Sequence, residues 1–263
     1  MLLPKGRNRP FLAVLIAVCL GFPLVARAEP PCPAAVASRL ELPATAAALS
    51  QHRPLSIVAL GSSSTEGAGA SAPERTYPAR LQALLRAALP DAAVTVLNRG
   101  VGGQTIDAVM DRIEADVLAL RPTLVIWQIG TNEVLRAIDP AYFAARLDLG
   151  VRRIRAGGAD LVLMDSQVAP RVDAGKKAVF DYLMAREARE REVSLFSRGG
   201  LMRAWIAGDS EGDPMIGLDG LHHTDRGYGC LAEALGASIL DAVARGGPGD
   251  VRGDVPLASV RKP

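Results

Sequence analysis

The chain has 263 residues, of which 49% are hydrophobic and 22% are charged. This length is sufficient for one sizeable hydrophobic core, and we expect a single folded domain. The 30 basic and 28 acidic residues nearly balance, so the charge gives no sign of a nucleic-acid partner.

Residues 1–28 have the three regions of a secretory signal peptide. The start is basic, residues 11–20 are apolar and uncharged, and residues 26–28 form an A-x-A cleavage site. A membrane anchor is the alternative, but the run is shorter than the roughly 20 apolar residues of a membrane span. We therefore expect cleavage after Ala28, no stable membrane anchor in the mature protein, and a secreted or periplasmic location. Cleavage leaves 26 basic and 28 acidic residues, a formal net charge of −2.

Two cysteines, Cys32 and Cys230, remain after this cleavage. An oxidising compartment allows them to pair. Cys32 lies in an N-terminal arm of residues 29–53, and Cys230 lies in the last predicted helix. A disulfide between them would attach the arm to that helix, and two unpaired thiols are the alternative.

Five short apolar runs are predicted to be strands, because near-continuous apolar runs of this length are typical of a sheet buried on both faces. They are residues 55–60, 93–98, 123–130, 159–165 and 193–197.

Between these runs, apolar residues recur at helical spacing. The predicted helices are residues 77–89, 105–120, 140–157, 178–192 and about 224–244. Alternation of strand and helix over residues 54–245 predicts an α/β fold, a three-layer α/β/α sandwich around a mainly parallel five-stranded sheet. Residues 246–263 are rich in Gly, Pro and charge, and we expect a disordered tail there.

Ligands of such sheets bind beyond the carboxyl ends of the strands. Four polar or glycine-rich segments lie there or just before the last helix: GSSSTEG (61–67), RGVGGQT (99–105), GTNE (130–133) and DGLHHT (219–224). Taken singly, each is ordinary turn or cap chemistry. Four such segments at one edge of a sheet would seldom occur by chance, and together they indicate a functional site.

The residue types in these segments suit acyl transfer. A serine hydroxyl is a poor nucleophile until a base takes its proton. A histidine held by a carboxylate is such a base, and Asp219 and His222 are close enough in sequence for one turn to join them. Glycine-loop N–H groups and an asparagine amide can stabilise the oxyanion.

This set resembles the SGNH, or GDSL-type, serine hydrolase family, whose marks Ser, Gly, Asn and His occur here in the family's order. The resemblance implies a flavodoxin-like fold, with Ser63 as nucleophile and with Asp219 and His222 as the family's D-x-x-H pair. It implies that esters are cleaved through an acyl-enzyme, with no cofactor and no metal.

The resemblance also implies an oxyanion hole made by the Ser63 N–H group, Gly103 and Asn132, with Gly102 as the alternative register for the glycine. Two positions depart from the family pattern. Ser62 stands where the family usually has Asp before the nucleophile, and Glu133 stands where GTND is usual. We expect these two departures to bear on loop geometry and subfamily rather than on the acyl transfer itself.

Ser210 is a rival nucleophile, because GDSEG (208–212) contains G-D-S and also fits G-x-S-x-G. A nucleophile elbow needs a strand before the serine and a helix after it. Ser210 follows an apparent helix in a charged loop, so we interpret this motif as a decoy.

Another alternative is a metal site formed by Asp219, His222, His223 and Asp225. Adjacent histidines usually point apart, and no H-E-x-x-H spacing supports the site. Loss of Ser, Asn or His from the set would indicate a glycan-binding module, and all three are present.

Several larger side chains are candidates for contacts around the site. We expect Trp127 in the core, Trp205, Tyr77 and Tyr228 flanking the site, and three arginines in or near the strand-end loops: Arg99, Arg136 and Arg171.

The sequence therefore predicts a secreted serine esterase acting on a small-molecule or glycan-linked ester, with a short acyl or O-acetyl group. An acyl transferase, a lysophospholipase and a thioesterase are the alternatives.

Overall fold

The computed structural model describes residues 31–33, 38–208 and 214–246. Its centre is a five-stranded sheet in the order β2-β1-β3-β4-β5, in which every pair of neighbouring strands is parallel. The predicted α/β class and the five strands are confirmed. The strands are β1 (Leu55–Gly61), β2 (Val94–Gly100), β3 (Leu124–Gln128), β4 (Asp160–Met164) and β5 (Ser194–Phe196).

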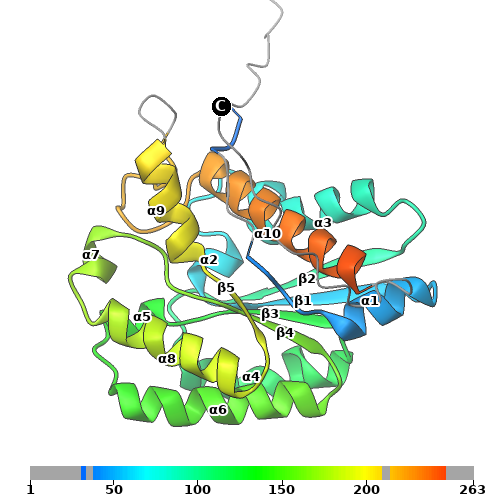
Figure 1. Ribbon diagram of the computed structural model, residues 1–263. Helices are drawn as coiled ribbons and strands as arrows, with labels where there is room; N and C mark the ends of the chain where they lie inside the picture. Colours follow the sequence, from blue (N-terminus) through cyan, green and yellow to red (C-terminus); the bar gives the residue numbers. More distant parts are fainter. Residues whose placement is uncertain (1–30, 34–37, 209–213, 247–263) are drawn as a thin grey trace, which may run out of the picture.

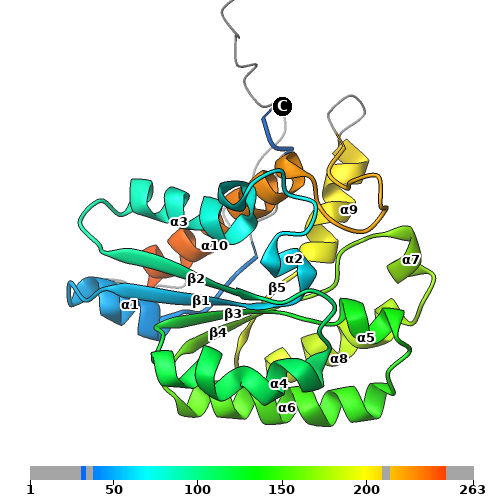
Figure 2. The same ribbon diagram turned by 180° about the vertical axis from the view of Figure 1, so that it is seen from behind.

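Helices cover both faces of the sheet, as a three-layer sandwich requires (Figures 1 and 2). One layer contains α1 (Pro43–Ser50), α3 (Tyr77–Ala88), α9 (Arg198–Gly208) and α10 (Asp225–Arg245). The opposite layer contains α4 (Ile106–Asp116), α6 (Pro140–Ala156) and α8 (Lys177–Glu190). Shorter helical segments are α2 (Ser63–Glu66), η1 (Pro73–Arg75), η2 (Leu118–Leu120), α5 (Thr131–Leu135) and α7 (Pro170–Asp173).

Strands β1, β3 and β4 are largely apolar and buried because alternate side chains enter two separate cores, whereas the edge strand β2 is partly exposed. Ile57 and Ala59 of β1 lie in the core beneath α3 and α10, whereas Val58 and Leu60 lie in the core beneath α4 and α6. Trp127 is fully buried in the second core, as predicted. There its ring packs against α6 so closely that a Cβ atom on Gly150 would lie 2.4 Å from it.

The N-terminal arm joins the same body. The predicted disulfide between Cys32 and Cys230 is confirmed and ties the arm to α10. Leu40 and Leu42 are buried in the first core. Helix α1, which was not predicted from the sequence, follows. Its start is fixed by the carboxylate of Asp160, which accepts hydrogen bonds from the Ala44 and Thr45 N–H groups.

The strand order places the polar segments at one switch point of the sheet. The chain moves from β1 outward to β2, and then back past β1 to β3. The loops that follow β1 and β3 therefore diverge at the carboxyl edge, where ligands of such sheets bind. None of the described helices is both long and apolar enough to cross a membrane. The predicted signal peptide and almost all of the predicted tail lie outside the described residues.

Candidate active site

Ser63 lies directly beyond β1, where the strand turns into α2. Gly61 ends the strand and Ser63 is the first residue of the helix, so the local path is strand, sharp turn and helix. This path presents a serine hydroxyl at the top of a sheet. The turn needs close backbone packing against β2, because a Cβ atom on Gly100 would lie 1.9 Å from the Glu66 nitrogen.

The structure brings Ser63, His222 and Asp219 into one hydrogen-bonded chain. His222 Nε2 lies 2.8 Å from Ser63 Oγ, and its Nδ1 lies 2.5 Å from Asp219 Oδ2. The His222 ring is largely buried, with 19% of the side chain exposed, whereas half of the Asp219 side chain is exposed. A base between a hydroxyl and a carboxylate can take the hydroxyl proton while the carboxylate stabilises the resulting imidazolium.

A local turn explains why these two residues meet. Asp219 Oδ1 accepts hydrogen bonds from the N–H groups of Leu221 and His222, both at 3.0 Å. Burial disfavours the charged carboxylate, but the hydrogen bonds from the His222 ring and the two backbone N–H groups outweigh it and lower the pKa of Asp219 to about 2. Thr224 then caps α10 by accepting a bond from the Gly227 N–H group.

The glycine loop after β2 lies beside the nucleophile. Gly103 adopts a left-handed backbone with φ of +72°, and its carbonyl accepts a 2.7 Å hydrogen bond from Arg136. A Cβ atom on the neighbouring Gly102 would lie 4.0 Å from the Ser63 Cβ. The loop is thus in contact range of Ser63, and both glycine registers stay open.

Asn132 lies in α5, the short helix beyond β3. Its Nδ2 atom donates a 2.8 Å hydrogen bond to the Gln104 carbonyl, which fixes the asparagine against the glycine loop. An amide nitrogen has two protons, so this bond leaves one donor for a substrate oxygen.

Glu133, the departure from the family pattern, connects the two helices that follow β2 and β3. It is almost fully buried, and its two carboxylate oxygens accept from the N–H groups of Ile106 at 2.6 Å and Gly130 at 2.9 Å. These groups lie at the starts of α4 and α5. Burial raises the pKa of Glu133, and the two backbone hydrogen bonds oppose that shift.

Two side chains that were not predicted from the sequence hold this edge together. Gln128, at the end of β3, accepts bonds from the Ser62 N–H and hydroxyl groups, next to the nucleophile. Arg112 of α4 donates to the Gly61 carbonyl at 3.0 Å and to Gln104 at 2.6 Å. A buried glutamine at a strand end is a signal for the first, whereas no local pattern marks the second.

The expectation that Trp205, Tyr77 and Tyr228 flank the site is wrong. All three are buried in the first core. The hydroxyl of Tyr228 donates to the Ala68 carbonyl at 2.7 Å, and that of Tyr77 lies 3.2 Å from Thr65 Oγ1. The two tyrosines thus support the segment behind Ser63, because a buried tyrosine needs a hydrogen-bond partner for its hydroxyl.

The three arginines have different surroundings. Arg136 bonds the glycine loop, as described, and Arg99 lies 3.6 Å from the Asp116 carboxylate. Arg171 is exposed on α7.

The residues of the alternative metal site point in different directions. The His223 ring is buried between Trp205 and Tyr228, and its Nδ1 lies 3.2 Å from the Met215 carbonyl. Asp225 bonds Ser71 instead. Within residues 31–33, 38–208 and 214–246, no group of three or more His, Cys, Asp or Glu side chains is placed to hold a metal ion. Ser210 lies outside the described residues.

The fold is that of SGNH-type hydrolases, a parallel α/β/α sandwich, and here Ser, His and Asp meet at the carboxyl edge. The chain belongs to the Non-GDSL lipase-like family, whose model matches residues 30–245. This match, together with the similarity to curated esterases and to solved structures of GDSL-type lipolytic proteins, confirms the resemblance to SGNH/GDSL-like lipases and esterases.

The curated relatives include two esterases with the following overlaps. An acetylxylan esterase from Geobacillus stearothermophilus is 36% identical over 85 residues, which are 32% of this chain and 39% of the relative. Esterase TesA from Pseudomonas aeruginosa is 25% identical over 127 residues, which are 48% of this chain and 60% of the relative. The chain thus spans less than two thirds of the length of these relatives.

Solved structures agree on the fold. A two-domain esterase active on acetylated mannans superposes with a TM-score of 0.69 at 23% identity, over 81% of this chain and 57% of that chain. A structure of TesA superposes with a TM-score of 0.56 at 22% identity, over 71% of this chain and 98% of that chain.

Proposed function

We propose that this protein is a serine esterase that hydrolyses carboxylic esters through an acyl-enzyme on Ser63. The observation that carries the proposal is the hydrogen-bonded chain from Asp219 through His222 to the Ser63 hydroxyl at the carboxyl end of β1. Membership of a lipase-like family and the similarity to named esterases support it.

The proposed reaction begins when His222 Nε2 takes the proton of Ser63 Oγ as this oxygen attacks the ester carbonyl. The pKa of Asp219, about 2, keeps its carboxylate charged against the imidazolium. His222 then gives the proton to the leaving alcohol. Water, activated by the same histidine, then attacks the acyl carbon; the bond from this carbon to Ser63 Oγ breaks, the carboxylic acid leaves, and His222 returns a proton to Ser63 Oγ.

The negative oxygen of the tetrahedral intermediate would be stabilised by the N–H groups of Ser63 and Gly103 and by the Asn132 amide. Each such donor is worth roughly 3 kcal/mol, or about 10²-fold in kcat. The hydrogen bonds from Asn132 and Arg136 to the glycine loop fix these donors before a substrate arrives, which supports this assignment.

The proposed substrate is a short-chain or O-acetyl ester, either small or attached to a glycan. The similarity to an acetylxylan esterase and the fold shared with an esterase active on acetylated mannans favour this class. A series of p-nitrophenyl esters tests it, with acetate expected to react fastest. Octanoate reacting much faster than acetate would favour the lipase and thioesterase alternatives.

Hydrolase and transferase activity differ only in the acceptor of the acyl group. Incubating an acetyl donor with and without a glycan oligosaccharide separates them. A hydrolase releases acetate at the same rate in both cases, whereas a transferase forms acetylated glycan.

We further propose that residues 1–28 are removed on export and that the mature protein, with its catalytic domain at residues 54–245, acts outside the cytoplasm. The disulfide between Cys32 and Cys230 supports this location, because such bonds persist in oxidising compartments. Mass spectrometry of the protein from a secreting host is expected to give a chain beginning at Glu29. A chain that retains residues 1–28 would contradict cleavage.

A further inference from the structure

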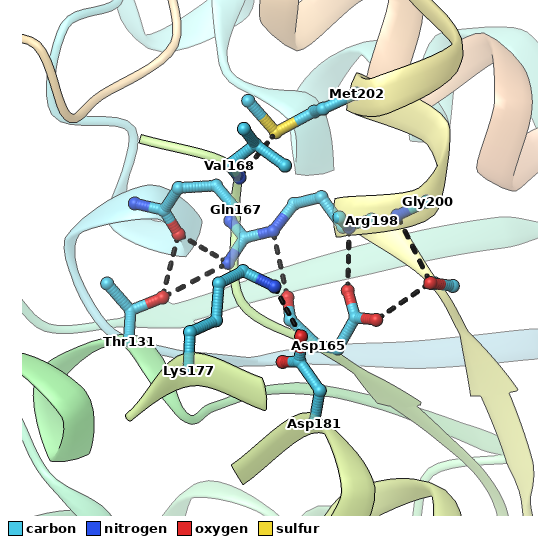
Figure 3. Close-up of polar contacts among 11 residues, drawn as sticks. Thr131, Asp165, Gln167, Val168, Lys177, Asp181, Arg198, Gly200 and Met202 are labelled. Atoms are coloured by element: carbon cyan, nitrogen blue, oxygen red, sulfur yellow. Dashed lines mark hydrogen bonds and ion pairs between the residues drawn. The ribbon is translucent and has the colours of Figure 1, made fainter. Parts of the chain in front are cut away.

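A fully buried arginine lies at the start of α9, just beyond the short strand β5. Arg198 has no exposed surface, and burial lowers its pKa. Its Nε donates to the Asp165 carbonyl at 3.0 Å, and its Nη2 donates to Gln167 Oε1 at 2.6 Å (Figure 3). The Asp165 carboxylate is held in turn by the N–H group of Gly199 and the hydroxyl of Ser197. Arg198 is not part of the hydrogen-bonded chain of Asp219, His222 and Ser63.

Arg198 determines which way the Gln167 amide faces. A guanidinium has donors only, so the amide oxygen of Gln167 must turn toward it. The Thr131 hydroxyl donates to the same oxygen at 2.7 Å. The amide nitrogen therefore points the other way, where it donates to the Leu221 carbonyl at 3.3 Å. Gln167 is almost fully buried, so water cannot readily replace these contacts.

Both ends of this connection lie next to the site. Leu221 lies inside the Asp219–His222 turn, and Thr131 precedes Asn132 at the start of α5. Gln167 thus joins the segment that carries the base to the segment that carries an oxyanion donor. These two segments lie far apart in the sequence, at residues 131–132 and 219–222.

We propose that Gln167 is a positioning residue, which holds the Asp219–His222 turn in register with α5, and that Arg198 locks its amide in the required orientation. The inference rests on the proposed esterase function for its kinetic consequence. A displacement of about 1 Å between base and nucleophile can cost on the order of 10²-fold in rate.

The substitution Gln167→Glu separates positioning from folding. A carboxylate keeps an oxygen for Arg198 and Thr131 and adds an opposite charge to the buried guanidinium. It replaces the donor to Leu221 by an oxygen that repels the carbonyl. We expect a melting temperature within a few degrees of the wild type, a kcat at least tenfold lower, and a KM within about twofold.

The matched control is Gln82→Glu, the same chemical change on α3 away from the site. Among the described residues, Gln82 makes its hydrogen bond through the amide oxygen, which accepts from the Val96 N–H group at 2.8 Å, so a carboxylate preserves the contact. This variant is expected to keep the wild-type kcat. An unchanged kcat in Gln167→Glu would overturn the inference, because the lost hydrogen bond to the Leu221 carbonyl would then have no effect on catalysis.

Arg198→Lys gives a second test if Gln167→Glu does not fold. Lysine keeps the charge but has no planar fork to hold both Asp165 and Gln167. The freed amide is expected to lower kcat about fivefold with little change in KM. A wild-type kcat in this variant would count against the inference.

The low-field proton resonance of His222 Nδ1–H, hydrogen-bonded to Asp219, reports positioning without catalysis. We expect it to shift or broaden in Gln167→Glu and to stay in place in Gln82→Glu. An inactive wild type would refute the esterase proposal alone, since this resonance still tests the position of His222. An unshifted resonance in Gln167→Glu would refute the positioning role.

Discussion

Replacing Glu133 by glutamine is expected to destabilise the protein and its oxyanion loop together. The carboxylate accepts from two buried N–H groups, those of Ile106 and Gly130. Glutamine has one oxygen, so one N–H group would face an amide NH₂ group and lose its acceptor. A hydrogen bond to a charged group contributes about 1.5–3 kcal/mol, and an unsatisfied buried group costs a similar amount.

Burial raises the pKa of Glu133, which means that a neutral side chain is easier to bury and part of this loss is recovered. We therefore expect Glu133→Gln to lower the free energy of unfolding by about 2–3 kcal/mol. For a domain of this size, about 2–4 °C per kcal/mol gives a Tm lower by about 4–12 °C.

The activity should fall as well, because Ile106 directly follows the loop that contains Gly103. Loss of its anchor lets that loop move, and we expect kcat/KM to fall at least tenfold. Glu133→Asp restores the residue usual in the family but shortens the reach, so it should keep one of the two bonds and give an intermediate loss.

Thermal melting by circular dichroism and p-nitrophenyl acetate hydrolysis measure both effects. The control is Glu114→Gln on α4, whose side chain is 72% exposed and pairs with Arg153 at 3.3 Å. A surface pair of this kind contributes at most about 1 kcal/mol. If Glu133→Gln has the Tm and the kcat/KM of the wild type, the bridging role of this carboxylate is refuted.

Three further outcomes are expected. Asp219→Asn should lower kcat on the order of 10⁴-fold with little change in the fold, and a loss below tenfold would contradict its role beside His222. Replacing Cys32 and Cys230 by serine should cost about 2–5 kcal/mol, seen as a lower Tm that reductant no longer changes. Burial lowers the pKa of His223 from 6.5 to about 3, so the unfolded chain binds a proton at this residue more readily than the folded protein. The free energy of unfolding is therefore unaffected by His223 titration above about pH 6.5. It falls by at most about 1.4 kcal/mol per pH unit between there and about pH 3. His223→Phe should therefore lose less stability than the wild type between pH 7 and pH 4.5 in urea unfolding, and an equal loss would refute this.

The sheet could be predicted from sequence because its inner strands β1, β3 and β4 are buried on both faces and therefore read as short apolar runs. The turn between Asp219 and His222 could be predicted because it is local. The aromatic side chains could not be placed, since Tyr77 and Tyr228 satisfy their hydroxyls on the segment behind Ser63 and so can be buried.

The contacts that hold the site are the part that sequence did not reveal. Gln167 joins residues that lie 36 and 54 positions away, and no spacing rule describes such pairs. Glu133 could be expected to cap its own helix as its third residue. Its second bond, to Ile106 on another helix, depends on how the loops pack.

The most direct test of the esterase proposal is hydrolysis of p-nitrophenyl acetate by the wild type, by Ser63→Ala and by Ser210→Ala, each checked for folding. We predict that Ser63→Ala abolishes turnover and that Ser210→Ala retains it. Full activity in Ser63→Ala, or loss of activity only in Ser210→Ala, would contradict the assignment of Ser63 as nucleophile.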